Sequence, residues 1–191
     1  ILPMIDWTRS MTWPETNLKW YPTSPNIPTL DAVAGYPMTG LGAQLGDFHH
    51  GIGTKHPFRF LTFKNKSAEE LKSALEQLNL SGLSYKILTL ENAEGKPVTG
   101  VYIVISDWSS WEPTDLAFAM MSLSAKWQNP SPFIGVKTSE ANLFNKHVGS
   151  TAWWNYIQKA KQNIDPRKFK LKWENEVSQF RSSIQPFLLY P

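Results

Sequence analysis

The stretch Tyr85–Ile105, YKILTLENAEGKPVTGVYIVI, decides the fold. Two runs rich in β-branched and aromatic residues, Tyr85–Leu90 and Val98–Ile105, flank Glu94-Gly95-Lys96, whose glycine and charges suit a turn. The sequence therefore predicts two adjacent strands that pair as an antiparallel hairpin.

Helices are predicted before and after this hairpin. Ser67-Ala68-Glu69-Glu70 has the pattern of a capping box, in which the serine and the last glutamate each bind the other's backbone amide. Pro113 is expected to begin a second helix, and Ser150 is expected to cap a third. The apolar residues of these helices recur at helical spacing: Leu71, Leu75 and Leu78, then Leu116, Met120, Leu123 and Trp127, then Trp153, Trp154 and Ile157.

The end of the chain predicts a further, amphipathic helix. Its apolar residues follow the spacing i, i+4, i+7, i+11, and charged residues occupy the other positions. The stripe consists of Trp173, Val177, Phe180 and Ile184. Such a stripe predicts a face packed in the core and not a cofactor site.

Together these patterns predict an α+β fold, in which a mixed or antiparallel sheet packs against helices after an aromatic, loop-rich N-terminal third. The length of 191 residues, 41% of them hydrophobic and 18% charged, predicts a single compact domain over residues 1–191. No apolar run approaches the roughly 20 residues that cross a bilayer. The absence of cysteine excludes disulfides, zinc–thiolate sites and thiol catalysis.

A proline-rich segment near the N-terminus is the first candidate for ligand binding. The two prolines in Ser24-Pro25-Asn26-Ile27-Pro28-Thr29 predict a stiff, non-helical loop. Its hydroxyl and amide groups match the hydroxyls and acetamido groups of a sugar, and the preceding Trp20 and Tyr21 offer aromatic faces for stacking. From local chemistry alone, an ordinary proline-braced turn remains the alternative.

The order of short motifs along the chain resembles the NamZ-like exo-β-N-acetylmuramidase family of bacterial peptidoglycan hydrolases. The resemblance rests on these motifs: Thr16-Asn17-Leu18-Lys19-Trp20, the Ser24–Thr29 hexad, Tyr36-Pro37, Thr39-Gly40, Gly53-Thr54 with Pro57-Phe58, Gly100-Val101, Phe144-Asn145-Lys146 with Gly149-Ser150, and Pro186–Tyr190. It therefore extends over nearly the whole chain.

Two departures from the family fall in segments expected to line the site. The usual Thr-Gly-Leu-Pro-Trp is Thr16-Asn17-Leu18-Lys19-Trp20 here, so the glycine and proline of a turn are replaced. A glutamate and an arginine that often precede the Gly-Thr pair are absent from Phe48–Thr54, which reads FHHGIGT. These departures predict an altered ligand.

The resemblance implies that the two halves of such a protein have different roles. Members of the family begin with a Rossmann-like half that carries the catalytic carboxylate, and this sequence corresponds to the C-terminal half that follows it. We therefore expect a substrate-orienting domain of a glycoside hydrolase, with the N-terminal catalytic half of the same or a companion chain as its partner. The family implies an extracytoplasmic location, in the periplasm or secreted. The alternative is a non-catalytic module that binds cell-wall glycan or another protein.

The expected ligand is a peptidoglycan fragment or a related glycan, and no cofactor is expected. The resemblance and the local chemistry together indicate one set of substrate-binding residues: Trp20, Tyr21, Ser24, Asn26, His50, Gly53 and Thr54. Glycines in this set let backbone amides approach a ligand closely.

The catalytic residues are not identified within this chain. Asp107 and Glu112 follow a predicted strand in an aromatic setting and are the in-chain candidates for acid–base chemistry. A turn former and a helix-entry charge are the simpler interpretations of the same two residues.

No metal site is predicted. His49, His50 and His56 lie near Asp47, but adjacent histidines of an extended chain point to opposite sides and no recognised ligand spacing is present.

The net charge of +3 favours an anionic partner. Basic residues gather toward the C-terminus: Lys159, Lys161, Arg167, Lys168, Lys170 and Lys172. A cell-wall polymer fits this surface, whereas nucleic acid is not expected because no recognised nucleic-acid-binding motif accompanies it. A solvated helix surface is the alternative.

Overall fold

The computed structural model describes residues 2–190. Its contacts divide the chain into two compact units, one formed by Pro22–Pro166 and one by the segments up to Tyr21 and from Arg167 onward. Among the described helices, none is long and apolar enough to cross a membrane.

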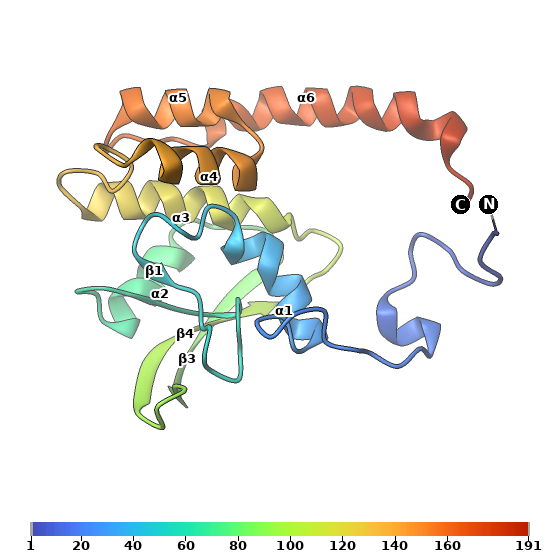
Figure 1. Ribbon diagram of the computed structural model, residues 1–191, viewed down its shortest axis with the longest axis horizontal. Coiled ribbons are helices and arrows are strands. Elements are labelled where there is room, and N and C mark those ends of the chain that lie inside the picture. The colour runs from blue at the N-terminus through green and yellow to red at the C-terminus, as the bar shows by residue number, and fades with distance from the viewer. Residues whose placement is uncertain (1, 191) are drawn as a thin grey trace. The chain divides into compact units, whose positions relative to one another are not determined.

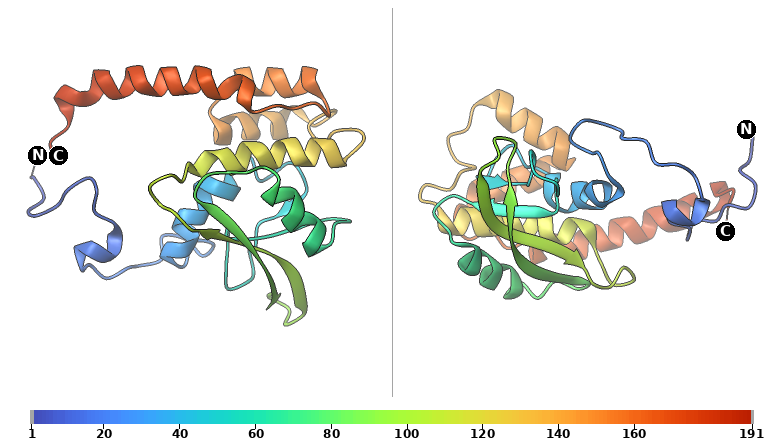
Figure 2. Two further views of the ribbon diagram at one scale, coloured as in Figure 1. Left: turned by 180° about the vertical axis from the view of Figure 1, so that it is seen from behind. Right: turned by 90° about the horizontal axis from the view of Figure 1, so that it is seen from below.

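The larger unit is built on one antiparallel sheet, which confirms the predicted α+β class. Its strands lie in the order β1-β2-β4-β3, and every neighbouring pair is antiparallel. The strands are β1 (Phe48–His49), β2 (Phe60–Phe63), β3 (Leu83–Glu91) and β4 (Pro97–Ile105). Figures 1 and 2 show the tip of the β3–β4 hairpin extending away from α3.

The predicted hairpin is confirmed residue by residue. Its register runs from Leu83 opposite Ile105 to Glu91 opposite Pro97. At the turn, Asn92 Oδ1 accepts hydrogen bonds from the backbone N–H groups of residues 94 and 96, at 3.0 and 2.9 Å. The asparagine side chain thus closes the turn that the sequence pattern predicts.

The helices of the larger unit are α1 (Leu30–Gly35), α2 (Ala68–Glu76), α3 (Pro113–Trp127), α4 (Thr138–Val148) and α5 (Thr151–Ala160), with a π-helical segment at Tyr36–Gly40. The capping box of α2 is confirmed, because Ser67 Oγ accepts from the Glu70 N–H and the Glu70 carboxylate accepts from the Ser67 N–H. The predicted Ser150 cap of α5 is also present, through the N–H of Trp153.

Helix α3 separates two packed layers (Figure 1). One face joins the main core with the sheet and α2, through Leu61, Leu71, Leu75, Val101, Ile103, Leu116 and Met120. On the other side, α4 and α5 bring Phe144 and Trp153, both fully buried. The Trp153 indole stacks edge-on against Phe118 of α3 at 5.0 Å and donates its Nε1–H to the sulfur of Met121 at 3.2 Å. Burial of these large side chains is the main source of stability.

The smaller unit holds α6 (Arg167–Ile184) and the two ends of the chain. The backbone N–H of Met4 donates to the Tyr190 hydroxyl at 2.7 Å, and the Trp7 and Tyr190 rings meet edge-on at 4.9 Å. Asn17 adopts a left-handed conformation with φ of 55°, which asparagine tolerates better than most residues. This explains how the departure from the family's glycine is accommodated at that turn.

The prediction that the stripe of α6 is core is wrong. No residue of α6 is buried, and Val177 and Phe180 are 46% and 61% exposed. Trp173 packs on Phe169 of the same helix, at 5.2 Å between ring centroids. Helical periodicity shows which face can be buried, but it does not supply an apolar surface to cover that face.

Gly100 allows β2 and β4 to approach closely. A Cβ atom at Gly100 would lie 2.6 Å from the backbone oxygen of Leu61 and 2.6 Å from the ring of Phe60. Because a backbone oxygen in a paired strand cannot move aside, any side chain here would push the two strands apart.

We expect Gly100→Ala to lower the free energy of unfolding by about 3 kcal/mol, as overpacking in a core does. Denaturant unfolding monitored by tryptophan fluorescence measures the change. Gly95→Ala is the matched control, because a Cβ atom there meets nothing within 4 Å. That control should lose only about 1 kcal/mol, from its positive φ. Equal losses for the two variants would contradict the close approach.

Candidate functional site

The Ser24–Thr29 loop is non-helical, as predicted, and leads directly into α1. Ser24 Oγ accepts from the Asn26 N–H at 3.1 Å, and the Ser24 carbonyl accepts from the Ile27 N–H at 3.0 Å. Thr29 Oγ1 then accepts from the Ala32 N–H at 3.2 Å and caps α1. The Asn26 side chain is exposed.

Helix α1 is anchored on the backbone of Phe58. A Cβ atom at Gly35 would lie 2.6 Å from the Phe58 carbonyl oxygen, so only glycine permits this approach. The Thr39 hydroxyl, which is buried, donates to the same carbonyl oxygen at 2.8 Å. Asp31 lies one helical turn before Gly35 and is therefore held close to the residue after Phe58.

Phe58 is strained. Its φ of 62° lies in the left-handed region, which is unfavourable for a bulky side chain. The buried ring packs edge-on against Tyr36 at 5.0 Å, and the backbone N–H donates to the His50 carbonyl at 2.6 Å. Packing and hydrogen bonds thus hold a conformation that directs the next residue, Arg59, toward α1.

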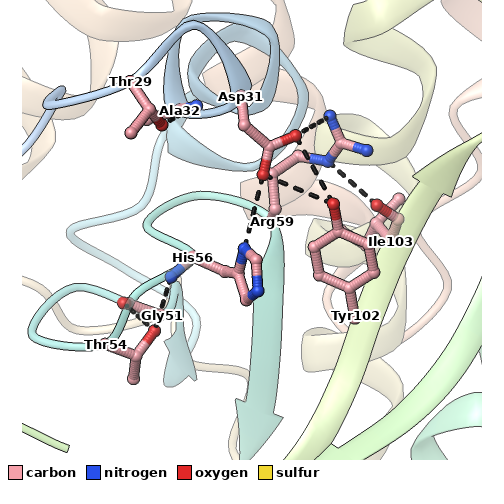
Figure 3. A network of polar contacts seen from close by, with 9 residues as sticks. All are labelled: Thr29, Asp31, Ala32, Gly51, Thr54, His56, Arg59, Tyr102 and Ile103. Atoms are coloured by element: carbon pink, nitrogen blue, oxygen red, sulfur yellow. Dashed lines mark hydrogen bonds and ion pairs between the residues drawn. The ribbon is translucent and has the colours of Figure 1, made fainter. Parts of the chain in front are cut away.

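Arg59 is a buried cation with two fixed partners. Its Nη1 lies 2.8 Å from Asp31 Oδ1, and its Nε–H donates to the Ile103 carbonyl at 2.9 Å (Figure 3). Only 6% of the Arg59 side chain is exposed, compared with 35% of the Asp31 side chain. A guanidinium buried to this degree requires a paired carboxylate.

Two further side chains complete this group, which we call the Asp31 cluster: Asp31, His56, Arg59 and Tyr102. The Tyr102 hydroxyl lies 3.4 Å from each Asp31 oxygen, and His56 Nδ1 lies 3.5 Å from Oδ2. The His56 and Tyr102 rings are 4.7 Å apart, and the Arg59 guanidinium lies 5.4 Å from the Tyr102 centroid. Burial raises the pKa of Tyr102 and the Asp31 charge adds to this, while Arg59 opposes it, so the hydroxyl stays protonated as a donor.

The Gly-Thr turn places His56 in the cluster. Thr54 Oγ1 donates to the Gly51 carbonyl at 2.7 Å and accepts from the His56 N–H at 3.1 Å (Figure 3). Gly53 is exposed, with a φ of +83°. Thr54 therefore binds the backbone of one cluster residue, His56, and Thr29 caps the helix that carries another, Asp31.

Trp20 and Tyr21 belong to the smaller unit. Trp20 is half-buried and meets Trp13 edge-on at 5.7 Å, and Tyr21 is 66% exposed with the Lys19 ammonium 5.0 Å from its ring centroid. Their role as sugar contacts stays a prediction.

His50 occupies an interior position. It is 7% exposed and lines a small cavity with Thr39 and Ser124, and neither ring nitrogen has a hydrogen-bond partner among the described residues. Burial, with a smaller contribution from His49, lowers the pKa of His50 to about 4. The nearby backbone carbonyls of Ala43 and Thr39 raise the pKa and so oppose this lowering, although neither is in hydrogen-bond geometry with the ring. The structure does not bring the His50 ring into the Asp31 cluster, and its role in ligand binding stays a prediction.

Asp107 and Glu112 do not join the cluster. The Asp107 carboxylate accepts hydrogen bonds from the Ser109 N–H, the Ser109 hydroxyl and the Ser110 hydroxyl. These bonds lower the pKa of Asp107 to about 2, so it is an ionised turn former and not an acid near neutral pH. Glu112 precedes α3 without a capping side-chain bond. The structure thus agrees with the simpler interpretation of both residues.

No sequence pattern indicated Asp31, Arg59 or Tyr102 as site residues, and the pattern around His56 was interpreted only in terms of a metal site. Within residues 2–190, no group of three His, Asp or Glu side chains is arranged to hold a metal. One signal was available, because Arg59 interrupts the apolar run Pro57–Leu61, and a charge inside such a run requires a partner.

His50 makes stability depend on pH. Its pKa is about 4 in the folded protein and about 6.5 when unfolded, so the unfolded chain binds more protons between these values. The full contribution of His50 to the free energy of unfolding is present above pH 6.5, and about 3 kcal/mol of it is lost as the pH falls to 4.

His50→Gln should remove this part of the pH dependence, measured by urea unfolding from pH 7 to 4. The exposed His147→Gln should keep it, and identical pH slopes for wild type and His50→Gln would refute the assignment.

Comparisons with known proteins agree with this architecture. Residues 34–190 match the family model described as the C-terminal part of the exo-β-N-acetylmuramidase NamZ. The chain is 24% identical over 196 residues to the peptidoglycan β-N-acetylmuramidase NamZ of Bacillus subtilis (strain 168). The alignment covers all of this chain and 45% of that protein.

A solved structure shows the same fold. The crystal structure of a DUF1343 family protein from Bacteroides fragilis NCTC 9343 matches with a TM-score of 0.82 and 25% identity, over 97% of this chain and 49% of that one. The chain thus spans about half the length of the relatives it matches. Because the family model covers most of its residues, the chain belongs to the NamZ C-terminal domain family.

Proposed function

We propose that this chain is the substrate-orienting part of a glycoside hydrolase that acts on peptidoglycan. Membership of the NamZ C-terminal family supports this, as does the similarity to a relative named as a peptidoglycan β-N-acetylmuramidase. Because only 45% of that relative is aligned, the proposed partner is an N-terminal catalytic half in the same or a companion chain. Peptidoglycan lies outside the cytoplasm, so the proposed location is extracytoplasmic.

One observation about charge supports the orienting role. Asp31 is the sole carboxylate of the Asp31 cluster, and both its oxygens face Arg59, His56 or Tyr102. Glycoside hydrolysis usually requires two carboxylates, about 5 to 10 Å apart on either side of the scissile bond. A single, internally paired carboxylate does not meet this requirement, so the catalytic carboxylate is assigned to the partner half.

The polar groups on the two loops that hold the predicted site residues suit the recognition of a sugar. Asn26 offers an exposed carboxamide on a hydrogen-bonded turn, Thr54 a hydroxyl, and Gly53 an exposed backbone segment. Such groups match the hydroxyls and the acetamido group of a terminal N-acetylmuramic acid unit. Holding that unit in a reactive orientation accelerates the reaction.

The test is Asn26→Ala in the intact protein, assayed on a chromogenic N-acetylmuramic acid glycoside. We expect kcat/KM to fall about tenfold, the effect of one lost hydrogen bond of about 1.4 kcal/mol. The melting temperature should not change, because the Asn26 side chain is exposed and the hydrogen bond of its turn uses the backbone N–H.

Asn142→Ala is the matched control, since Asn142 is an exposed asparagine on α4. It should leave kcat/KM unchanged. Unaltered kinetics for Asn26→Ala would remove that residue from the site. Binding of muropeptides without hydrolysis by the intact protein would favour a non-catalytic glycan-binding module instead.

A further inference from the structure

His56 has one ring nitrogen beside a carboxylate and one that is open. Nδ1 lies 3.5 Å from Asp31 Oδ2. Among the residues that the structure describes, none forms a hydrogen bond or an ion pair with Nε2, and 27% of the side chain is exposed. Simple orientation of a sugar does not require this arrangement, because an amide or a hydroxyl would serve as well.

The ring is fixed from two sides. The Thr54 hydroxyl binds the backbone N–H of His56, and the Tyr102 ring lies against the imidazole at 4.7 Å (Figure 3). Asp31 itself is held by Arg59 at 2.8 Å. Together these contacts favour an orientation of the imidazole with Nδ1 toward Asp31, which leaves Nε2 for proton transfer.

Asp31 from α1 and Tyr102 from β4 face the His56 ring, and Arg59, which lies just before β2, pairs with the same Asp31. The carboxylate at Nδ1 favours the tautomer with its proton on Nδ1, which leaves Nε2 as a proton acceptor. The same carboxylate stabilises the imidazolium ion that forms when Nε2 takes up a proton.

We propose that His56 accepts a proton at Nε2 during glycoside hydrolysis and that Asp31 is the positioning residue that fixes its tautomer. This rests on the proposed function, because it requires the substrate to lie beside the Asp31 cluster. It goes beyond that function by giving this half a part in the chemistry.

The step conserves atoms and charge. A water proton passes to Nε2 while the water oxygen bonds to the anomeric carbon, and the bond from that carbon to the leaving oxygen breaks. A carboxylic acid of the partner half donates a proton to the leaving oxygen. His56 then releases its proton to solvent and the partner carboxylate takes one up, so that one water is consumed.

The tautomer can be measured on this chain without the catalytic half. In ¹⁵N NMR spectra at pH 8, we expect a protonated Nδ1 and an unprotonated Nε2 for His56. Asp31→Asn should shift the ring toward the opposite tautomer, while the resonances of His147 stay unchanged. A wild-type His56 with its proton on Nε2 would overturn the proposal.

Kinetics of the intact protein give the second readout. His56→Gln should lower kcat/KM by about 10²- to 10⁴-fold, as loss of a general base does, and should abolish the fall in rate at acidic pH that histidine protonation causes. Asp31→Asn should lower the rate less. His147→Gln, on α4, is the control and should retain both the rate and the limb.

The outcomes separate the two proposals. If Asn26→Ala lowers activity while His56→Gln keeps the rate and its acidic limb, the proton-transfer role falls and the orienting function stands. If the intact wild-type protein has no activity on N-acetylmuramic acid glycosides, both are overturned.

Discussion

The charge of a buried arginine is the constraint on which the candidate site depends. Arg59 lies between the strained Phe58 and the first residue of β2 and is almost fully buried, so its guanidinium has lost most of its contact with water. The Asp31 carboxylate and the Ile103 carbonyl replace that hydration. Removing a partner from a buried pair usually costs about 3 to 5 kcal/mol, although the partial exposure of Asp31 reduces that figure here. α1, β2 and β4 therefore keep a fixed relation to one another.

Small details of the backbone make this pairing possible. Gly35 lets α1 touch the Phe58 carbonyl, and Thr39 binds the same atom. Phe58 keeps a left-handed conformation that a bulky residue rarely adopts. Strain of this kind persists only where surrounding contacts enforce it, and it is common near functional sites. The exposed edge of the cluster, with Thr54 and His56, is thus supported by a rigid interior.

The sequence predicted the local structure well and the cluster poorly, for physical reasons. The α2 capping box, the α5 cap and the β3–β4 hairpin depend on residues near one another in the chain, so their patterns are readable. Helix α4 was missed because its N-cap is Lys137, which provides no side-chain cap bond. The stripe of α6 was misjudged because periodicity does not show what covers a face. Asp31 and Tyr102 are 71 residues apart, and no local pattern reports such a contact.

That separation also bears on when the cluster forms during folding. Contacts between residues so far apart require the closure of long loops, and they form slowly compared with helices and hairpins. The cluster needs α1 docked on Phe58 and β2 paired with β4, so it cannot exist in a partly folded chain. The surface assigned to the substrate is therefore a late product of folding, and a chain that has formed only its helices and the β3–β4 hairpin would not present it.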